Sequence, residues 1–277
     1  MRRSAALVLA GVILLPVAGC HPRQPPADLS LDPAQLLAQV REAQAPVRAV
    51  QGEARLRVRS GRGSGNVRQF TAAERPDRIH LEELDFFGNP VAVLVAAGGR
   101  FAFYDSRQRV LYRGAATPAN LARLVPLQLS AEDLVSFLLG TAPLIDGTPV
   151  EAAPDGSRVR LRLESGGARQ ELWVGEHAAV EKAVRTPDRG PGPGEWEAEF
   201  SRHQERHGAW FPGLVSVRSR SAGVDVELNW SEVEVNGALD PRLFDEPAPK
   251  GARVVEVGEG GEARAPRNAP ARATVAL

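Results

Sequence analysis

The side chains best suited to chemistry in this sequence are five histidines, a single cysteine and a few neighbouring carboxylates. His203 and His207 are four residues apart, but they lack the His-Glu-x-x-His order of zinc enzymes, and no third ligand lies nearby in the sequence. Glu82 and Glu83 are adjacent, and neighbours in a strand point to opposite faces, so they cannot act as a pair. We therefore predict no catalytic residue, no metal site and no cofactor, and we expect the protein not to be an enzyme.

The only cysteine, Cys20, follows a short apolar segment near the amino terminus. Arg2 and Arg3 precede the apolar run from Ala5 to Val17, a pattern typical of a secretory signal and too short for a retained membrane span. The residues Val17-Ala18-Gly19-Cys20 resemble a bacterial lipobox. This resemblance implies cleavage after residue 19 and acylation of Cys20, whose several chains would anchor the protein at ~0.8 kcal/mol per buried methylene. An ordinary signal peptide that contains a cysteine is the alternative.

The residues after the cleavage site suggest where the anchor lies. Residues 20–31 contain Pro22, Pro25 and Pro26, which is typical of an extended tether. His21 occupies the position where an aspartate would resemble an inner-membrane retention signal. We therefore expect a lipid-anchored protein on the periplasmic face of the outer membrane.

Charge and composition exclude other classes of protein. The chain has 34 Lys plus Arg against 34 Asp plus Glu, and loss of residues 1–19 removes two arginines, leaving a net charge of −2. A nucleic-acid partner is not expected, because binding to phosphates needs a basic excess. With 43% hydrophobic residues, the region 32–247 can bury the core of one domain, whereas the Pro- and Gly-rich residues 248–277 predict a disordered tail.

The domain is predicted to be mainly β. From Val50 to Arg59, apolar or small residues alternate with polar ones, as in a strand with one dry and one wet face. Residues Gly61 to Asn66 predict a turn. Short strands with glycine-rich turns between them indicate one antiparallel sheet or an incomplete barrel. The other predicted strands are Arg78–Leu84, Val91–Ala97, Arg100–Tyr104, Arg109–Tyr112, Arg158–Glu164, Gln170–Val174, Trp196–Phe200, Leu214–Arg220 and Val224–Trp230.

Three helices are predicted beside the strands. The first spans Pro33 to Val47, and the second begins with Thr117 as N-cap. The third begins at a capping motif on Ser130 and ends before Gly140, with an apolar stripe of Leu134, Phe137 and Leu138.

A sheet with one apolar face and helices that cover it describes a hydrophobic container. Acyl chains are the natural cargo, because each methylene left in water costs ~0.8 kcal/mol. The alternative is that the apolar faces meet in a filled core, in which case the stripe of the third helix is ordinary packing.

Three segments resemble a known family. They are Leu84-Asp85-Phe86-Phe87-Gly88-Asn89-Pro90, the segment from Leu124 to Leu129 that continues to Pro143, and Leu239-Asp240-Pro241-Arg242-Leu243-Phe244. With the order of elements from Pro33 to Asp245, they resemble the LolB family of outer-membrane lipoprotein receptors, within the LolA/LolB-like superfamily. The most specific part of the resemblance is Leu84 to Pro143.

The resemblance implies a single, strongly curved antiparallel sheet, an unclosed barrel with an N-terminal helix and two short lid helices over an apolar cavity. It also implies that acyl chains of lipoproteins are received from a soluble LolA-like periplasmic carrier and released into the outer membrane. In the family a protruding loop carries an exposed bulky apolar residue before a glycine. Here that position is Phe87, with Phe86 before it and Gly88 after it, although the family typically has leucine. Both rings could instead be core, but an extended segment cannot place both on one face.

The residues expected to line the cavity are apolar positions of the strands and of the third helix: Leu56, Val58, Ile79, Leu81, Val93, Leu134, Phe137, Leu138 and Trp230. Two other functions remain open, because one fold serves several purposes. One is a general carrier of lipids or glycolipids. The other is a structural or sensing module that binds a protein partner through the sheet edge or the lid.

Overall fold

A computed structural model of the chain describes residues 24–61, 63–125, 127–190, 192–247 and 249–259. The leader 1–19, Cys20 and the first tether residues lie outside the described residues, so the lipobox and the anchor stay predictions. Within the described segments, no helix has both the length and the apolar character needed to cross a membrane.

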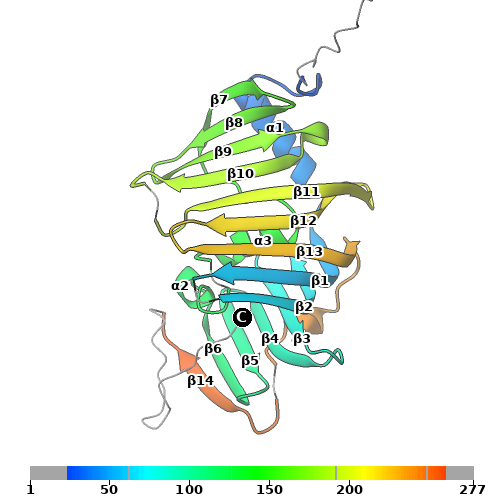
Figure 1. Cartoon of the computed structure of the whole chain (residues 1–277), viewed down its shortest axis with the longest axis vertical. Helices are drawn as coiled ribbons and strands as arrows, with labels where there is room; N and C mark the ends of the chain where they lie inside the picture. The colour runs from blue at the N-terminus through cyan, green and yellow to red at the C-terminus, as the bar shows by residue number, and fades with distance from the viewer. Residues whose placement is uncertain (1–23, 62, 126, 191, 248, 260–277) are drawn as a thin grey trace, which may run out of the picture.

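Fourteen strands of the described chain form one sheet, and three α-helices accompany them (Figure 1). The sheet order is β14-β6-β5-β4-β3-β2-β1-β13-β12-β11-β10-β9-β8-β7. The helices are α1 (Pro33–Gln44), α2 (Pro118–Leu121) and α3 (Ala131–Leu138), with short 3-10 turns η1 (Glu176–Ala178) and η2 (Pro241–Phe244). The strands are β1 (Ala49–Ser60), β2 (Gly63–Glu74), β3 (Arg78–Leu84), β4 (Pro90–Ala97), β5 (Arg100–Asp105), β6 (Val110–Ala115), β7 (Thr148–Asp155), β8 (Arg158–Glu164), β9 (Ala168–Val174), β10 (Val180–Pro187), β11 (Trp196–Arg206), β12 (Ala209–Ser219), β13 (Val224–Val235) and β14 (Arg253–Val257).

Two meanders, β1–β6 and β7–β13, meet along the antiparallel pair β1–β13. At this seam Gly52 has φ +154°, and a Cβ atom there would lie 2.1 Å from the carbonyl oxygen of Glu232, so only glycine fits. The register shifts one residue later, between Glu53 and Ala54. The sheet is strongly curved and unclosed, with few helices, which confirms the predicted mainly β fold.

The predicted helix starts are confirmed by their caps. Thr117 Oγ1 accepts a hydrogen bond from the Asn120 amide at 3.3 Å, and Ser130 Oγ accepts one from the Asp133 amide at 3.1 Å. The Asp133 carboxylate pairs with Arg185 at 3.3 Å. Gly140 adopts φ +66° after α3, as its predicted place beyond the helix end requires.

Two predictions about loops and tail are corrected. The predicted turn Gly61–Asn66 is short, because Gly63 already begins β2 and Asn66 pairs with Arg57 of β1. The tail predicted to be disordered from residue 248 contains β14, which pairs in parallel with β6. The folded domain therefore extends beyond the predicted boundary at residue 247.

Strand β14 is the outermost strand at one border of the sheet, and specific contacts hold it there. Arg113 of β6 pairs with Glu256 at 2.6 Å and with Glu246 at 3.0 Å. Asn120 of α2 donates from Nδ2 to the carbonyl oxygen of Gly258 at 3.1 Å, which ties the segment after β14 to a lid helix. A Cβ atom on Gly114 would lie 2.4 Å from the carbonyl oxygen of Val257, so the close approach of β14 depends on a glycine in β6.

The outer face of β3–β5 is covered by η2. His80 Nδ1 lies 2.6 Å from the carbonyl oxygen of Leu243, and the Arg78 guanidinium lies 4.1 Å from the centre of the Phe244 ring. The segment Leu239–Phe244 therefore covers part of the outer face of β3 and β4, where His80 and Val95 are buried.

Candidate functional site

The inner face of the sheet and the helices share one apolar core. Phe137 of α3 meets Trp196 of β11 edge to face at 5.1 Å and stacks on Phe200 at 6.3 Å. On β13, Trp230 lies 6.2 Å from Phe211. This region, between α3 and β11–β13, is filled by aromatic rings.

A small apolar cavity lies under the link between α2 and α3. Its volume is about 70 Å³, well below the roughly 300–1,000 Å³ of pockets that enclose whole ligands. We call it the inner cavity; it is lined by Leu56, Val58, Val67, Gln69, Leu81, Glu83, Ala92, Leu94, Phe103, Leu124 and Val125.

The structure brings together only some of the residues predicted to line a cavity. Leu56, Val58 and Leu81 line the inner cavity. The other predicted residues, apart from Val93, belong to the surrounding core or pack against it: Ile79, Leu134, Phe137, Leu138 and Trp230.

The expectation for Val93 is wrong. Val93 pairs with Glu82 and Tyr104, whereas Leu94 pairs with Leu81 and Phe103. Paired residues of neighbouring strands share a face, so Leu94 faces the inner cavity and Val93 faces outward.

Two polar residues of the inner cavity were not expected. Gln69 is buried and donates from Nε2 to Thr71 Oγ1 at 2.8 Å. Glu83 also faces the cavity, and burial raises the pKa of its carboxyl group; Arg107 opposes this shift, and Asp105 adds to it. The alternation of β3 places Glu83 on the same face as Leu81, and this pattern could have identified Glu83 as a cavity residue.

A larger hollow of about 490 Å³ opens at one end of the strands, where the β1–β2 and β12–β13 turns meet the loop before β11. We call it the strand-end hollow. Its lining consists of Ser60, Gly61, Ala122, Leu127, Gln128, Leu129, Pro193, Gly194, Glu195, Trp196, Ser219, Ser221, Ala222 and Val224. No pattern in the sequence predicts this hollow, because its residues come from four separate segments.

The turn between β3 and β4 exposes two phenylalanines. Phe86 is 91% and Phe87 85% exposed, and their rings meet edge to face at 5.5 Å. Asp85 Oδ1 accepts hydrogen bonds from the amides of Phe87 and Asn89, both at 2.8 Å. These bonds, first of all the one from Asn89, lower the pKa of the Asp85 carboxyl group. With Gly88 at φ +85°, they fix a tight turn that holds both rings in water, so neither ring is part of the core.

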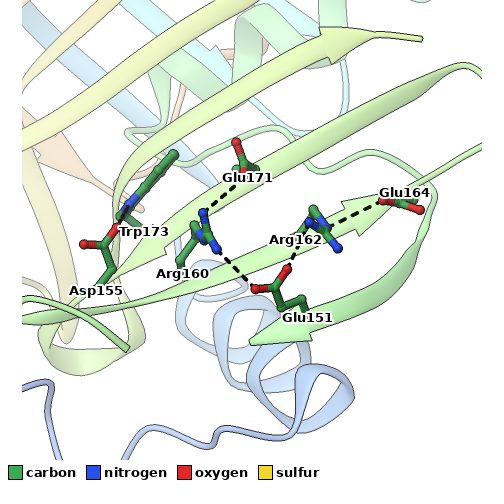
Figure 2. Close-up of polar contacts among 7 residues, drawn as sticks. All are labelled: Glu151, Asp155, Arg160, Arg162, Glu164, Glu171 and Trp173. Atoms are coloured by element: carbon green, nitrogen blue, oxygen red, sulfur yellow. Dashed lines mark hydrogen bonds and ion pairs between the residues drawn. The ribbon is translucent and has the colours of Figure 1, made fainter. Parts of the chain in front are cut away.

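The outer face of β7–β9 carries charges in matched pairs (Figure 2). Glu151 forms ion pairs with Arg160 at 3.1 Å and with Arg162 at 3.0 Å, and Arg160 also pairs with Glu171 at 3.7 Å. These side chains are about one-third exposed, and such surface pairs contribute little to stability. This face is a solvated surface with its charges balanced.

The histidines form no metal site in the described chain. His203 is stacked parallel to Trp210 at 6.1 Å, and burial lowers its pKa. His177 lies on Trp210 as well, at 4.6 Å. No cluster of three or more His, Cys, Asp or Glu that could hold a metal ion occurs among the residues that the structure describes.

No protein-family model and no curated protein matches the sequence. Solved structures match the fold. A domain described as that of an outer-membrane lipoprotein-sorting protein from Vibrio parahaemolyticus is 12% identical, with TM-score 0.55, over 77% of this chain and 97% of that one. A LolA superfamily protein from Nitrosomonas europaea is 12% identical, with TM-score 0.54, over 78% and 99%.

The fold is LolA-like. A third structure, of a DUF1329 family protein from Desulfovibrio piger, is 14% identical with TM-score 0.53 over 78% of this chain and 98% of that one. These matches confirm the architecture expected from the sequence, whereas membership of the LolA/LolB-like superfamily stays a prediction. The narrower resemblance to the LolB family stays a prediction.

Proposed function

We propose that the protein is a lipid-anchored receptor on the periplasmic face of the outer membrane, without enzymatic activity, that receives acyl chains of lipoproteins and helps to insert them. Cys20 would carry the anchor, and a soluble LolA-like carrier would deliver the cargo. The similarity of the fold to a lipoprotein-sorting domain and to a LolA superfamily protein supports lipid or lipoprotein handling in the cell envelope at a general level.

The exposed Phe86–Phe87 turn carries this proposal. Transfer of two phenylalanine rings from water to a membrane contributes about 3 kcal/mol or more, and a soluble surface rarely leaves such a pair bare. The turn is held rigid by Asp85, so the rings do not fold back onto the domain. A membrane surface is the partner that fits two adjacent apolar rings at the tip of a hairpin.

The small inner cavity supports the proposal that the protein opens to receive an acyl chain. Its lining is apolar apart from Gln69 and Glu83, and its roof is the irregular α2–α3 link. An acyl chain would displace Leu124 and Val125 and occupy the space between them and β1–β5. The contacts it would make have little direction, so the chain could be released again.

The test is delivery of a reporter lipoprotein to the outer membrane in cells that depend on this protein. Phe87→Glu should lower delivery at least tenfold, because a charge at the tip opposes entry into the bilayer. Val150→Glu, at an exposed apolar residue of β7, is the matched control and should leave delivery unchanged. Unimpaired delivery with Phe87→Glu would contradict the proposal.

The anchor is tested separately. Cys20→Ala should give a periplasmic form that no longer sediments with membranes. Retention of this variant in membranes would contradict the predicted lipidation.

A general carrier of lipids or glycolipids is the second candidate, favoured by the apolar lining of the inner cavity. Native mass spectrometry separates the two functions. A receptor should be found with lipoprotein acyl chains, whereas a carrier should retain free lipid.

A further inference from the structure

The strand-end hollow combines an apolar floor with polar groups at its rim. Leu127, Leu129 and Trp196 are buried apolar residues of its lining, while Ser219 and Ser221 line it from the β12–β13 turn. The serine hydroxyls lie 3.2 Å apart, and Ser221 Oγ donates to the carbonyl oxygen of Gly192 at 3.0 Å. Its volume of about 490 Å³ lies within the range of pockets that bind small-molecule ligands, about 300–1,000 Å³.

Two residues of this lining each carry a buried polar atom that has no hydrogen-bond partner in the described chain. The atoms are Trp196 Nε1, on a side chain only 1% exposed, and Glu195 Oε2. Buried polar groups are nearly always paired, because each unpaired group loses its bonds to water without compensation. Trp196 Nε1 can only donate, and a carboxylate oxygen can only accept. The missing partner is therefore a group that offers one acceptor and one donor.

An amide is such a group, since its carbonyl oxygen accepts and its N–H donates. We propose that the strand-end hollow binds the amide of a long-chain N-acyl ligand, with Trp196 donating to the carbonyl oxygen and Glu195 accepting from the N–H. An ester offers only acceptors, so Glu195 would distinguish N-acyl from O-acyl chains. This inference rests on the proposed function and specifies which acyl linkage the protein recognises.

The hollow lies at the same end of the strands as the turn that we propose contacts the membrane, from which an acyl ligand would enter. Strand β2 begins at Gly63 beside the hollow, and β3 runs antiparallel to β2 and ends at Leu84, so the Phe86–Phe87 turn follows at the same end of the sheet. The membrane-facing rings and the amide-binding groups therefore share one strand end. Leu127 and Leu129 of the hollow and Leu124 and Val125 of the inner cavity belong to the same α2–α3 link, so a chain attached to the amide would run beneath this link toward the inner cavity.

The test compares two ligands that differ in one linkage: N-(2-hydroxyethyl)hexadecanamide and 2-hydroxyethyl hexadecanoate. Residues 20–277 with Cys20→Ala are loaded with a fluorescent fatty acid, and each ligand is titrated to displace it. The amide should bind at least about tenfold more tightly than the ester, as expected for one added hydrogen bond to a buried charged group.

Variants assign the preference to the two residues. Glu195→Leu should bring the ratio of amide to ester affinity close to one and leave the ester affinity unchanged. Trp196→Phe should weaken both ligands several-fold, because both carbonyl groups lose the same donor. Glu199→Leu is the matched control, since Glu199 is exposed on the outer face of β11, and it should leave the ratio as in the parent protein.

The outcomes separate this inference from the proposed function. Failure of both ligands to displace the probe would count against acyl binding altogether. Equal affinity for amide and ester in the parent protein, or an unchanged preference in Glu195→Leu, would overturn the inference and leave acyl binding intact.

Discussion

In both meanders of the sheet, apolar inner residues alternate with polar outer ones. The meander β1–β6 has more exceptions to this pattern than β7–β13. In β7–β13 the inner residues are packed aromatic and aliphatic side chains, and the outer charges are paired, as Figure 2 shows for β7–β9. In β1–β6 the inner face encloses a cavity with Glu83 in its lining, and a turn leaves two phenylalanines in water. The interior of β7–β13 stabilises the domain, whereas β1–β6 carries the inner cavity and the exposed turn that a membrane can contact.

The largest effect on stability is expected in the filled half. Phe137→Ala removes a ring that contacts Trp196 and Phe200, and the free energy of unfolding should fall by about 3–5 kcal/mol. Urea unfolding followed by circular dichroism measures it. Leu138→Ala on the same helix, at a half-buried side chain, should cost less. A loss below about 1 kcal/mol for Phe137→Ala would show that α3 is only loosely packed.

A smaller effect, dependent on pH, is expected in the cavity half. The pKa of Glu83 is raised above its ordinary value of 4.5, so the folded state holds this proton more tightly than the unfolded state. The stability that protonated Glu83 contributes is present below pH 4.5 and is lost as the pH rises through the raised pKa. Between pH 4.5 and the raised pKa, the free energy of unfolding should therefore fall less steeply with pH in Glu83→Gln than in the parent protein. Urea unfolding at a series of pH values is the measurement, and an unchanged slope would show that Glu83 does not titrate there.

The charge pairs of the outer face should contribute little. Glu151→Ala breaks the pairs with both Arg160 and Arg162 and should lower the free energy of unfolding by less than about 1 kcal/mol. Added salt should reduce the difference further. A loss of several kcal/mol would mean that these charge pairs contribute as much to the free energy of unfolding as residues of the core do.

The smallest effect on stability is expected at the exposed turn. Phe86→Ser combined with Phe87→Ser should change the free energy of unfolding by no more than about 0.5 kcal/mol, because neither ring contacts the core. The same variant should bind vesicles of phosphatidylethanolamine and phosphatidylglycerol at least tenfold more weakly in a flotation assay. A large fall in the free energy of unfolding would show that the two rings pack against the domain, contrary to this prediction.

The sequence predicted those parts of the fold that local rules determine. The alternation of β1, the caps on Thr117 and Ser130 and the place of Gly140 are set by neighbouring residues, and all agree with the structure. Strand β2 was missed because its first residues are Gly63-Ser64-Gly65-Asn66, which are typical of a turn. Strand β14 was missed because its partner β6 is more than a hundred residues away in the sequence.

The site was less predictable than the fold for two physical reasons. The face of Val93 could not be assigned, because β4 is apolar at nearly every position and η2 covers part of the outer face of β3–β5. Glu195 and Trp196 are adjacent residues of ordinary type, and their lack of partners depends on loops from three other segments. The exposed turn, in contrast, was predictable from Phe86-Phe87-Gly88, since two successive rings cannot share one face of a strand.

An unclosed sheet leaves two borders where another chain could add a strand, and both borders of this one are protected against self-assembly. At one border β14 covers β6 at a distance that only Gly114 permits, and β14 itself is a strand of only 5 residues that carries the charged Arg253 and Glu256. At the other border β7 contains Pro149 and Pro154, which have no amide hydrogen to offer to a neighbour. A bulkier residue at position 114 would displace β14 and leave the edge of β6 open. Its first effect would therefore be aggregation and low solubility, before any change in what the protein binds.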